Sequence, residues 1–244
     1  MGWPPRVETA ISIANAMGRP VNVVTNYSTG PLRDIFAADE AHARSSEIAG
    51  RLGPSDFNMP WINARADVIA ADLIRGEYGR VEVAFPETFE DATNSLAWER
   101  WLVSGRLSSV RAELALAMKQ PDEALTWARR ALDMARVSGR KKYEVIASMT
   151  LGRALTASGL AGDATTQLRS AVAEADALGS PLYRWQTRAA LAEAVRAVEG
   201  EDAADAHMTE AVAIIREVLA GLSPEHAAGY AAAPQVAAVL AAVS

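Results

Sequence analysis

Apolar positions along this chain recur mostly at the three- to four-residue spacing that places them on one face of a helix. Residues 151–172, LGRALTASGLAGDATTQLRSAV, show the arrangement, because two helix-like halves are joined by a break at Gly159. No run shows the strict alternation of apolar and polar residues that favours a strand. The pattern predicts an all-α protein.

Glycine and proline divide this pattern into separate helices. We expect breaks near 18–20, 53–54, 76, 120–121, 159, 179–181, 200 and 223–224. The helices then fall near 6–17, 20–29, 34–50, 60–75, 78–92, 95–118, 121–137, 141–158, 161–178, 182–198, 202–220 and 234–242. Pro121 and Pro181 occupy first-turn positions, where a missing N–H costs little. Pro86 should end or kink its helix around Val81–Phe85.

The same motif returns every 40 residues. PDEALTWARRALDMA, AGDATTQLRSAVAEA and EDAADAHMTEAVAII superpose, and their shared small residues are Ala124, Ala164 and Ala204, then Ala131, Ala171 and Ala211. The preceding segments agree at Ala112, Gly152 and Ala192, and at Ala115, Leu155 and Val195. An earlier unit, NARADVIAADLIRGEYGRVEVAF, fits if its break at Gly76 is matched to Gln120, and the segment from 23 to 52 fits loosely. The chain is therefore a stack of helical hairpins.

Small residues stand where a helix would normally carry bulk. Gly152 lies in the first helix of its hairpin and Ala164 in the second, so the two helices can cross at close range there. Ala171 then leaves room for the next hairpin.

This packing pattern resembles the tetratricopeptide repeat (TPR). The residues that carry the resemblance are Leu151, Gly152, Leu155, Ala164, Leu168 and Ala171, with weaker sets at Ala112, Ala115, Ala124, Ala128 and Ala131 and at Ala192, Val195, Ala204, Met208 and Ala211. An aliphatic residue or alanine replaces the usual aromatic, the terminal proline is absent, and the unit has 40 residues where about 34 are usual. The resemblance implies an α-solenoid of stacked antiparallel hairpins in one domain, 1–244, with less regular units over 1–94, regular units over about 95–221, and a cap over 222–244 whose helix carries Val236, Val239, Leu240 and Val243.

The longer unit resembles the C-terminal helical-repeat regions of large bacterial signalling proteins, in which an NTPase module precedes the repeats and LuxR-type or adenylate-cyclase domains are attached. The segments that carry this resemblance include NARADVIAADLIRGEY and LGSPLYRWQTRAALAEAV. No G-x-x-x-x-G-K-[ST] loop, cyclase segment or DNA-binding segment accompanies them, so no catalytic residue is implied. The chain is either a standalone repeat protein or a piece of a larger one.

Composition narrows the choice of partners. Half of the residues are apolar, the net charge is -6, and there is no cysteine. The acidic balance disfavours direct binding to nucleic acid or an anionic membrane, and the absence of cysteine excludes disulfides and thiolate metal sites and suits a reducing cytoplasm. We expect no signal segment. We also expect no membrane span, because Pro234 and Gln235 interrupt the alanine-rich tail.

Motifs for catalysis or metal binding are missing. His42, His207 and His226 lie in different units without metal-ligand spacing, so we expect surface or packing roles and neither metal nor cofactor. There is no G-x-S-x-G elbow, and the scattered acids suit solvated helix faces. The basic stretch GRKKYE at 139–144 is too short for a nucleic-acid patch and suits an interhelix turn.

Tryptophans offer two interpretations. Trp98 and Trp101 lie three residues apart on one helix face, where core packing is the favoured role and an exposed anchor pair for a ligand the alternative. We expect Trp61, Trp127 and Trp185 to serve packing.

Carrying over the positions that line the concave groove in TPR proteins gives a mixed-charge wall. Its residues are Arg65, Asp72, Arg106, Glu113, Arg153, Gln186, Glu193 and Arg196. Interhelix ion pairs, such as Arg106 with Glu113, are the equally weighted alternative for these residues. We expect a non-enzymatic module that binds a peptide, protein or small ligand in bacterial signal transduction or transcriptional regulation, with a protein or peptide or an upstream NTPase module as partner. Self-association through the solenoid ends, giving a homo-oligomer, is the alternative, and an enzyme with a groove site is a weaker one that no motif supports.

Overall fold

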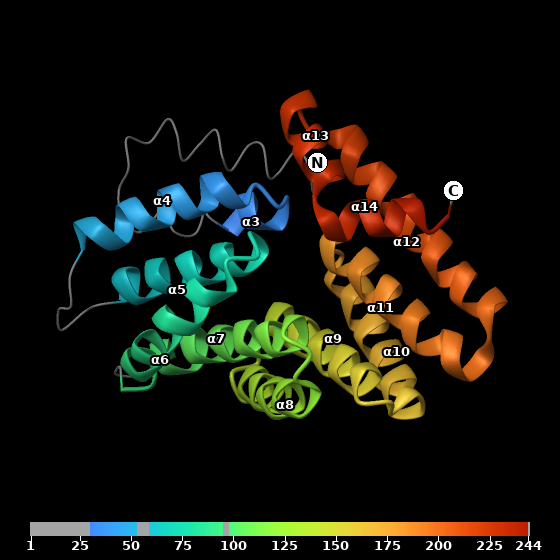
Figure 1. Cartoon of the computed structure of the whole chain (residues 1–244), viewed down its shortest axis with the longest axis horizontal. Helices are drawn as coiled ribbons and strands as arrows, with labels where there is room; N and C mark the ends of the chain where they lie inside the picture. The colour runs from blue at the N-terminus through green and yellow to red at the C-terminus, as the bar shows by residue number, and fades with distance from the viewer. Residues whose placement is uncertain (1–29, 53–58, 95–97, 244) are drawn as a thin grey trace. The chain divides into compact units, whose positions relative to one another are not determined.

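The computed structural model describes residues 30–52, 59–94 and 98–243, and this part of the chain is helical without strands (Figure 1). Its helices are α3 (Gly30–Asp34), α4 (Ala38–Arg51), α5 (Met59–Ile74), α6 (Tyr78–Asn94), α7 (Trp98–Ala117), α8 (Pro121–Val137), α9 (Lys141–Ala157), α10 (Ala161–Leu178), α11 (Pro181–Glu199), α12 (Glu201–Gly221), α13 (Pro224–Ala232) and α14 (Pro234–Ala241). The all-α prediction is confirmed. The helices expected over 6–17 and 20–29 lie outside the described residues.

Most expected helices are present, and α8 and α10 have the expected bounds. Two expectations were wrong. The helix expected over 34–50 begins only at Ala38, as α4, because a turn at Phe36, whose φ of 58° lies in the left-handed region, separates it from the short helix α3. No helix was expected between 220 and 234, yet Pro224–Ala232 forms α13.

Pro86 does not end its helix, although an end or a kink was expected there, and the helix expected over 78–92 is present. α6 continues to Asn94, and its buried face lies on both sides of the proline, with Val81 and Phe85 before it and Thr88 and Ala92 after it. The Phe85 and Phe89 rings also stack, with centroids 5.2 Å apart. Packing on both sides therefore offsets the hydrogen bond that the proline removes.

The described helices divide into two compact units. Unit 1 contains the described residues up to Val110 together with 221–231, and unit 2 contains 111–220 together with 232–243. The division falls inside α7, so this helix contributes residues to both units.

Unit 2 has the packing of consecutive helical hairpins. α8 packs against α9, α9 against α10, and α10 against α11, while α9 also contacts α11 (Figure 1). We call α7, α9 and α11 the first helices of the hairpins and α8, α10 and α12 the second helices. The repeat-position residues are buried: Ala112, Ala115, Ala124, Ala131, Gly152, Leu155, Ala164, Ala171, Ala192, Val195, Ala204 and Ala211. The 40-residue repeat read from the sequence thus corresponds to equivalent buried positions.

Gly152 brings α9 and α10 together, although the contact differs from the expected one. A Cβ atom built on Gly152 would lie 2.3 Å from Cγ of Leu168, which is fully buried. The three atoms nearest to such a Cβ all belong to Leu168, one helical turn after the expected Ala164, which is also fully buried.

Left-handed residues end several helices in the same way. The N–H of Lys119 bonds to the carbonyl of Leu116, and the N–H of Gln120 to that of Ala115; the turns at Gly76 and Gly159 repeat this pair of bonds. These are the two bonds of a Schellman motif. Lys119, with φ of 58°, is thus the equivalent of Gly76 and Gly159, and the match of Gly76 to Gln120 is wrong by one residue.

The expected cap consists of two helices that belong to different units. In unit 1, the ring of Tyr230 on α13 lies 5.5 Å from that of Phe36, and Tyr230 is fully buried. In unit 2, Val236 and Val239 of α14 are buried, whereas Leu240 is half-buried and Val243 is exposed. The apolar role expected for the tail therefore holds for its first half.

Candidate functional site

A row of alternating charges crosses the first helices of unit 2. Glu113 on α7, Arg153 on α9 and Glu193 on α11 are 40 residues apart in turn and so occupy the same repeat position. We call these three residues the first-helix row. Their signs alternate, so each member can interact favourably with the next.

Glu113 and Arg153 form the closest contact of the row. Nη1 of Arg153 donates a hydrogen bond to Oε2 of Glu113, and Oγ1 of Thr150, also on α9, donates to Oε1 of Glu113 at 2.7 Å. The charge of Glu113 raises the pKa of Arg153 above its usual value, and the charge of Glu193 adds to this effect. The guanidinium therefore stays charged and joins α9 to α7.

Glu193 differs from Glu113 because it is exposed and makes no hydrogen bond or ion pair with the described residues. Nε of Arg196, one turn later, instead donates to Oε2 of Glu201 at 2.8 Å. Gln186, two turns before Glu193 on α11, is half-buried. The predicted residues of α11 thus include two exposed charges, of which one is already paired.

Arg106 belongs to a separate cluster inside unit 1. Its guanidinium donates to Oδ1 of Asp67 and, at 2.8 Å, to Oδ1 of Asn63, both on α5. Nη1 of Arg33 on α3 also lies 2.5 Å from Oδ1 of Asp67, which is 2% exposed. Two guanidiniums compensate this buried carboxylate, as burial of a charge requires. Arg106 and Glu113 lie on the same helix and pair with different helices, so the expected pair between them is absent.

Arg65 and Asp72 are held by contacts within unit 1. Arg65 pairs with Asp91 at 2.6 Å and with Glu87 at 2.9 Å, both on α6, and its guanidinium lies 4.6 Å from the centre of the Trp61 ring. Asp72 is buried, and its Oδ1 lies 3.0 Å from Nη1 of Arg75 and 3.3 Å from Nε2 of His42. These two predicted site residues therefore take part in helix packing.

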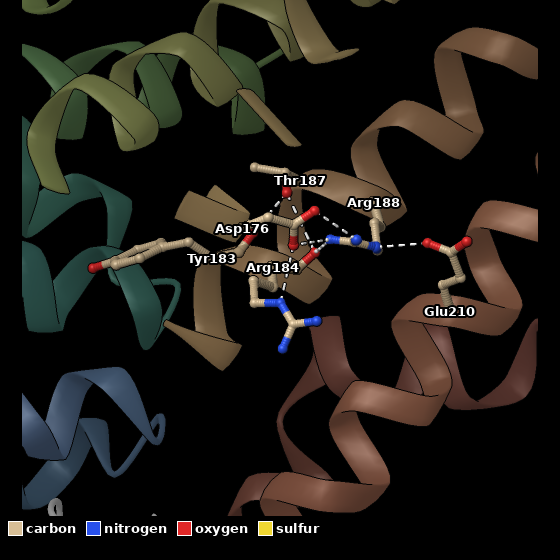
Figure 2. A network of polar contacts seen from close by, with 6 residues as sticks. All are labelled: Asp176, Tyr183, Arg184, Thr187, Arg188 and Glu210. Atoms are coloured by element: carbon tan, nitrogen blue, oxygen red, sulfur yellow. Dashed lines mark hydrogen bonds and ion pairs between the residues drawn. The ribbon is translucent and has the colours of Figure 1, made fainter. Parts of the chain in front are cut away.

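A further network joins α10, α11 and α12, as Figure 2 shows. Nη1 and Nη2 of Arg188 each donate to a different oxygen of Asp176 at 2.9 Å, and Nε donates to Glu210 at 2.7 Å. Nε of Arg184 donates to the same carboxylate at 3.0 Å. Hydrogen bonds from Arg188, followed by those from Arg184, lower the pKa of Asp176 below its usual value. Arg188 is thus a clamp between three helices.

The tryptophans have different environments. Trp185 is 2% exposed and Trp127 packs against the unit 2 core, which confirms their packing roles. Trp101 is 44% exposed, so the core position favoured for it was wrong. The side chain of Trp98 lies outside the described residues. Trp101 accordingly meets one requirement of the alternative role, an exposed aromatic anchor.

Neither a metal-binding cluster nor a membrane-spanning helix occurs among the described residues. No group of three or more metal-ligating side chains occurs in them. No helix among them is both long and apolar enough to cross a membrane. His226 shares a contact of 3.1 Å with Oγ of Ser223, which suits the packing role expected for the histidines.

Several residues of these clusters were not identified from the sequence. The main residues that sequence reasoning missed are Thr150, Arg33, Asn63, Asp67, Asp176 and Arg188. The sequence carries a signal for the first-helix row, because opposite charges 40 residues apart at 113, 153 and 193 predict contacts between neighbouring hairpins. Asp176 and Arg188 carry no such signal, since their spacing of 12 depends on the angle between α10 and α11.

Comparison with known proteins identifies the fold. No protein-family model and no curated protein sequence matches the chain. A putative kinesin light chain from Podosopora anserina with nearly identical TPR-like repeats is similar in structure, with a TM-score of 0.54 and 15% identity over 89% of this chain and 98% of that one. Aspartyl phosphate phosphatase F from Bacillus subtilis has a TM-score of 0.61 and 12% identity, and the match covers 96% of this chain and 62% of the phosphatase. At such identities the likeness shows the fold alone, which is a TPR-like helical repeat.

Proposed function

We propose that this chain is a non-enzymatic binding module that holds a protein or peptide partner on the first helices of its hairpins. We place it in bacterial signal transduction or transcriptional regulation, where its 40-residue units resemble the repeat regions that follow NTPase modules. An upstream NTPase module is then one natural partner, in the same or another chain.

The observation that carries this proposal is the first-helix row. A helical repeat places equivalent residues of successive units next to one another, so the row forms a continuous strip of polar side chains. Arg153 keeps 41% of its side chain exposed although it is paired, and Glu193 is exposed as well. Partly exposed charges on helices that otherwise bury alanine and leucine can orient a bound chain and select it by charge.

The test is capture of a partner from a lysate of the encoding organism, with identification by mass spectrometry and affinity measurement by calorimetry. Two row variants are compared: Arg153→Gln changes a member of the row, and Gln186→Tyr changes the surface of α11 two turns from Glu193. Arg129→Gln is the matched control on the exposed side of α8. We expect the two row variants to weaken binding of the identified partner by about tenfold or more, or 1.4 kcal/mol, and the control to bind as tightly as the wild type.

Stability must be followed in parallel, because Arg153 also holds Glu113. Thermal melts separate lost binding from unfolding, and Gln186→Tyr removes no ion pair. If both row variants bind like the control while retaining their fold, recognition lies elsewhere and the proposal fails. If light scattering shows a stable homo-oligomer and nothing else is captured, the architectural role is the better description.

A further inference from the structure

We infer that Glu193 is the open end of the first-helix row and receives a cationic side chain, arginine or lysine, from the bound protein partner. This inference rests on the proposed function and specifies the chemistry that the partner must supply.

The protein contains a template for this contact. Two hairpins earlier, at the equivalent repeat position, the carboxylate of Glu113 accepts a hydrogen bond from the guanidinium of Arg153 on the next first helix. The same repeat position thus already binds a cationic side chain within the chain itself. A guanidinium suits this position because it can donate two parallel hydrogen bonds to one carboxylate.

The chain supplies no such cation to Glu193. Forty residues further on stands Ala233, which carries no charge. Arg196 is hydrogen-bonded to Glu201, and Arg153 is hydrogen-bonded to Glu113. Both arginines affect Glu193 only through their charges, because the described residues make no hydrogen bond to it. The carboxylate is left exposed and ready to accept donors.

The surface around Glu193 favours a long basic side chain. Residues 187–192 of α11 are buried, so Gln186 and Glu193 are the side chains of this stretch that reach the surface. The aliphatic stem of an arginine or lysine from the partner can lie beside Gln186 while its charged end reaches the carboxylate of Glu193. Asp202 and Asp205 in the first turns of α12 are also exposed, which adds negative potential near Arg196.

The arginines of this region do not favour an acidic partner, because they are already paired within the chain. A partner carboxylate that bound Arg153 would have to displace Glu113. The charge of Glu113 would then be left without its cationic partner in a partly buried site. The same argument applies to Arg196 and Glu201. Recognition by Glu193 requires no existing ion pair to break.

The test uses two fluorescein-labelled nine-residue peptides of alternating residues, one of arginine and alanine and one of citrulline and alanine. Citrulline has the shape of arginine without its charge, so the pair isolates the cation. Anisotropy titrations at about 50 mM salt keep screening low. We expect the wild type to bind the arginine peptide about tenfold tighter, and Glu193→Gln to remove at least about fivefold of that affinity. Glu217→Gln, an exposed carboxylate elsewhere on α12, is the matched control and should stay within about twofold.

Equal binding of the two peptides by the wild type overturns the inference, and so does an equal effect of Glu193→Gln and Glu217→Gln. The absence of any binding of the arginine peptide overturns it as well. The proposed function can survive these results. If the partner captured from lysate is lost with Gln186→Tyr but bound normally by Glu193→Gln, the row binds its partner without a cation at Glu193.

Discussion

No side chain fits at position 152 unless Leu168 moves. A methyl group there would lie 2.3 Å from Cγ and 2.6 Å from Cδ2 of Leu168, whose side chain is fully buried and cannot turn into solvent. We predict that Gly152→Ala lowers the free energy of unfolding by about 1–3 kcal/mol, the usual cost of overpacking, and that Gly152→Leu lowers it further.

Gly162 on α10 is the matched control, because a Cβ there meets nothing within 4 Å. Gly162→Ala should raise stability by roughly 0.5–1 kcal/mol through the better helix propensity of alanine. Urea denaturation checks both variants. Similar effects of the two substitutions would mean that α9 and α10 do not cross at Gly152.

Substitutions at the left-handed residues of two hairpin turns should change stability in opposite directions. Gly159 has φ of 76°, and Lys119 has φ of 58° at the equivalent place. Gly159→Ala should cost about 1–2 kcal/mol, because a Cβ atom disfavours this region. Lys119→Gly should raise the melting temperature, since relief of that strain exceeds the added entropy of glycine in the unfolded chain. A lower melting temperature for Lys119→Gly would contradict the Schellman assignment.

Arg188 joins three helices of unit 2 and is held by the carboxylate of Asp176, and this dependence makes a prediction about pH. The folded pKa of Asp176 is depressed, chiefly by hydrogen bonds from Arg188, so its contribution to stability is present above the unfolded value of about 3.9. The contribution is lost as the pH falls through the folded pKa. We predict that Asp176→Asn is less stable than the wild type at pH 7 and that this difference shrinks during acidification below about pH 4.

Chemical denaturation of the two proteins at several pH values measures this difference. Glu217→Gln, outside the network, should change stability by less than about 0.5 kcal/mol at pH 7. A difference between Asp176→Asn and the wild type that stays constant from neutral to acid pH would show that the ionised carboxylate does not hold α10, α11 and α12 together.

The terminal helix α14 should protect the apolar surface of unit 2. Val236 is fully buried and Val239 is 7% exposed, so removal of the helix exposes whatever they cover. We predict that deletion of 233–244 lowers solubility and promotes association, because an open end of a helical repeat needs a cap. Light scattering of the truncated protein checks this, and a monomer with an unchanged melting temperature would show that α14 is a free tail.

At the scale of elements the sequence predicted the bounds of α8 and α10, where glycine or proline marks the ends of a strongly periodic segment. It failed where the signal was absent or misleading. Phe36 adopts a left-handed turn without being glycine, so nothing in the sequence marked the boundary between α3 and α4. The short helix α13 has one buried side chain, Tyr230, and therefore no periodic pattern to find.

Across the whole chain, the 40-residue repeat determined the fold class because equivalent buried alanines can be recognised from spacing alone. The candidate site could be predicted only in part. The sequence identified Arg106, Glu113, Arg153 and Glu193, but pairing depends on which helix faces each residue. Arg106 consequently pairs with Asp67 in unit 1 and Glu113 with Arg153 in unit 2, although both lie on α7.

The surface that meets the partner can be measured directly by photo-crosslinking. Benzoylphenylalanine is placed at Gln186, beside Glu193 on α11, and in a second protein at Thr166, exposed on α10. After irradiation with the captured partner, a crosslink from position 186 and none from position 166 is the predicted result. A crosslink from position 166 and none from position 186 would contradict binding along the first helices.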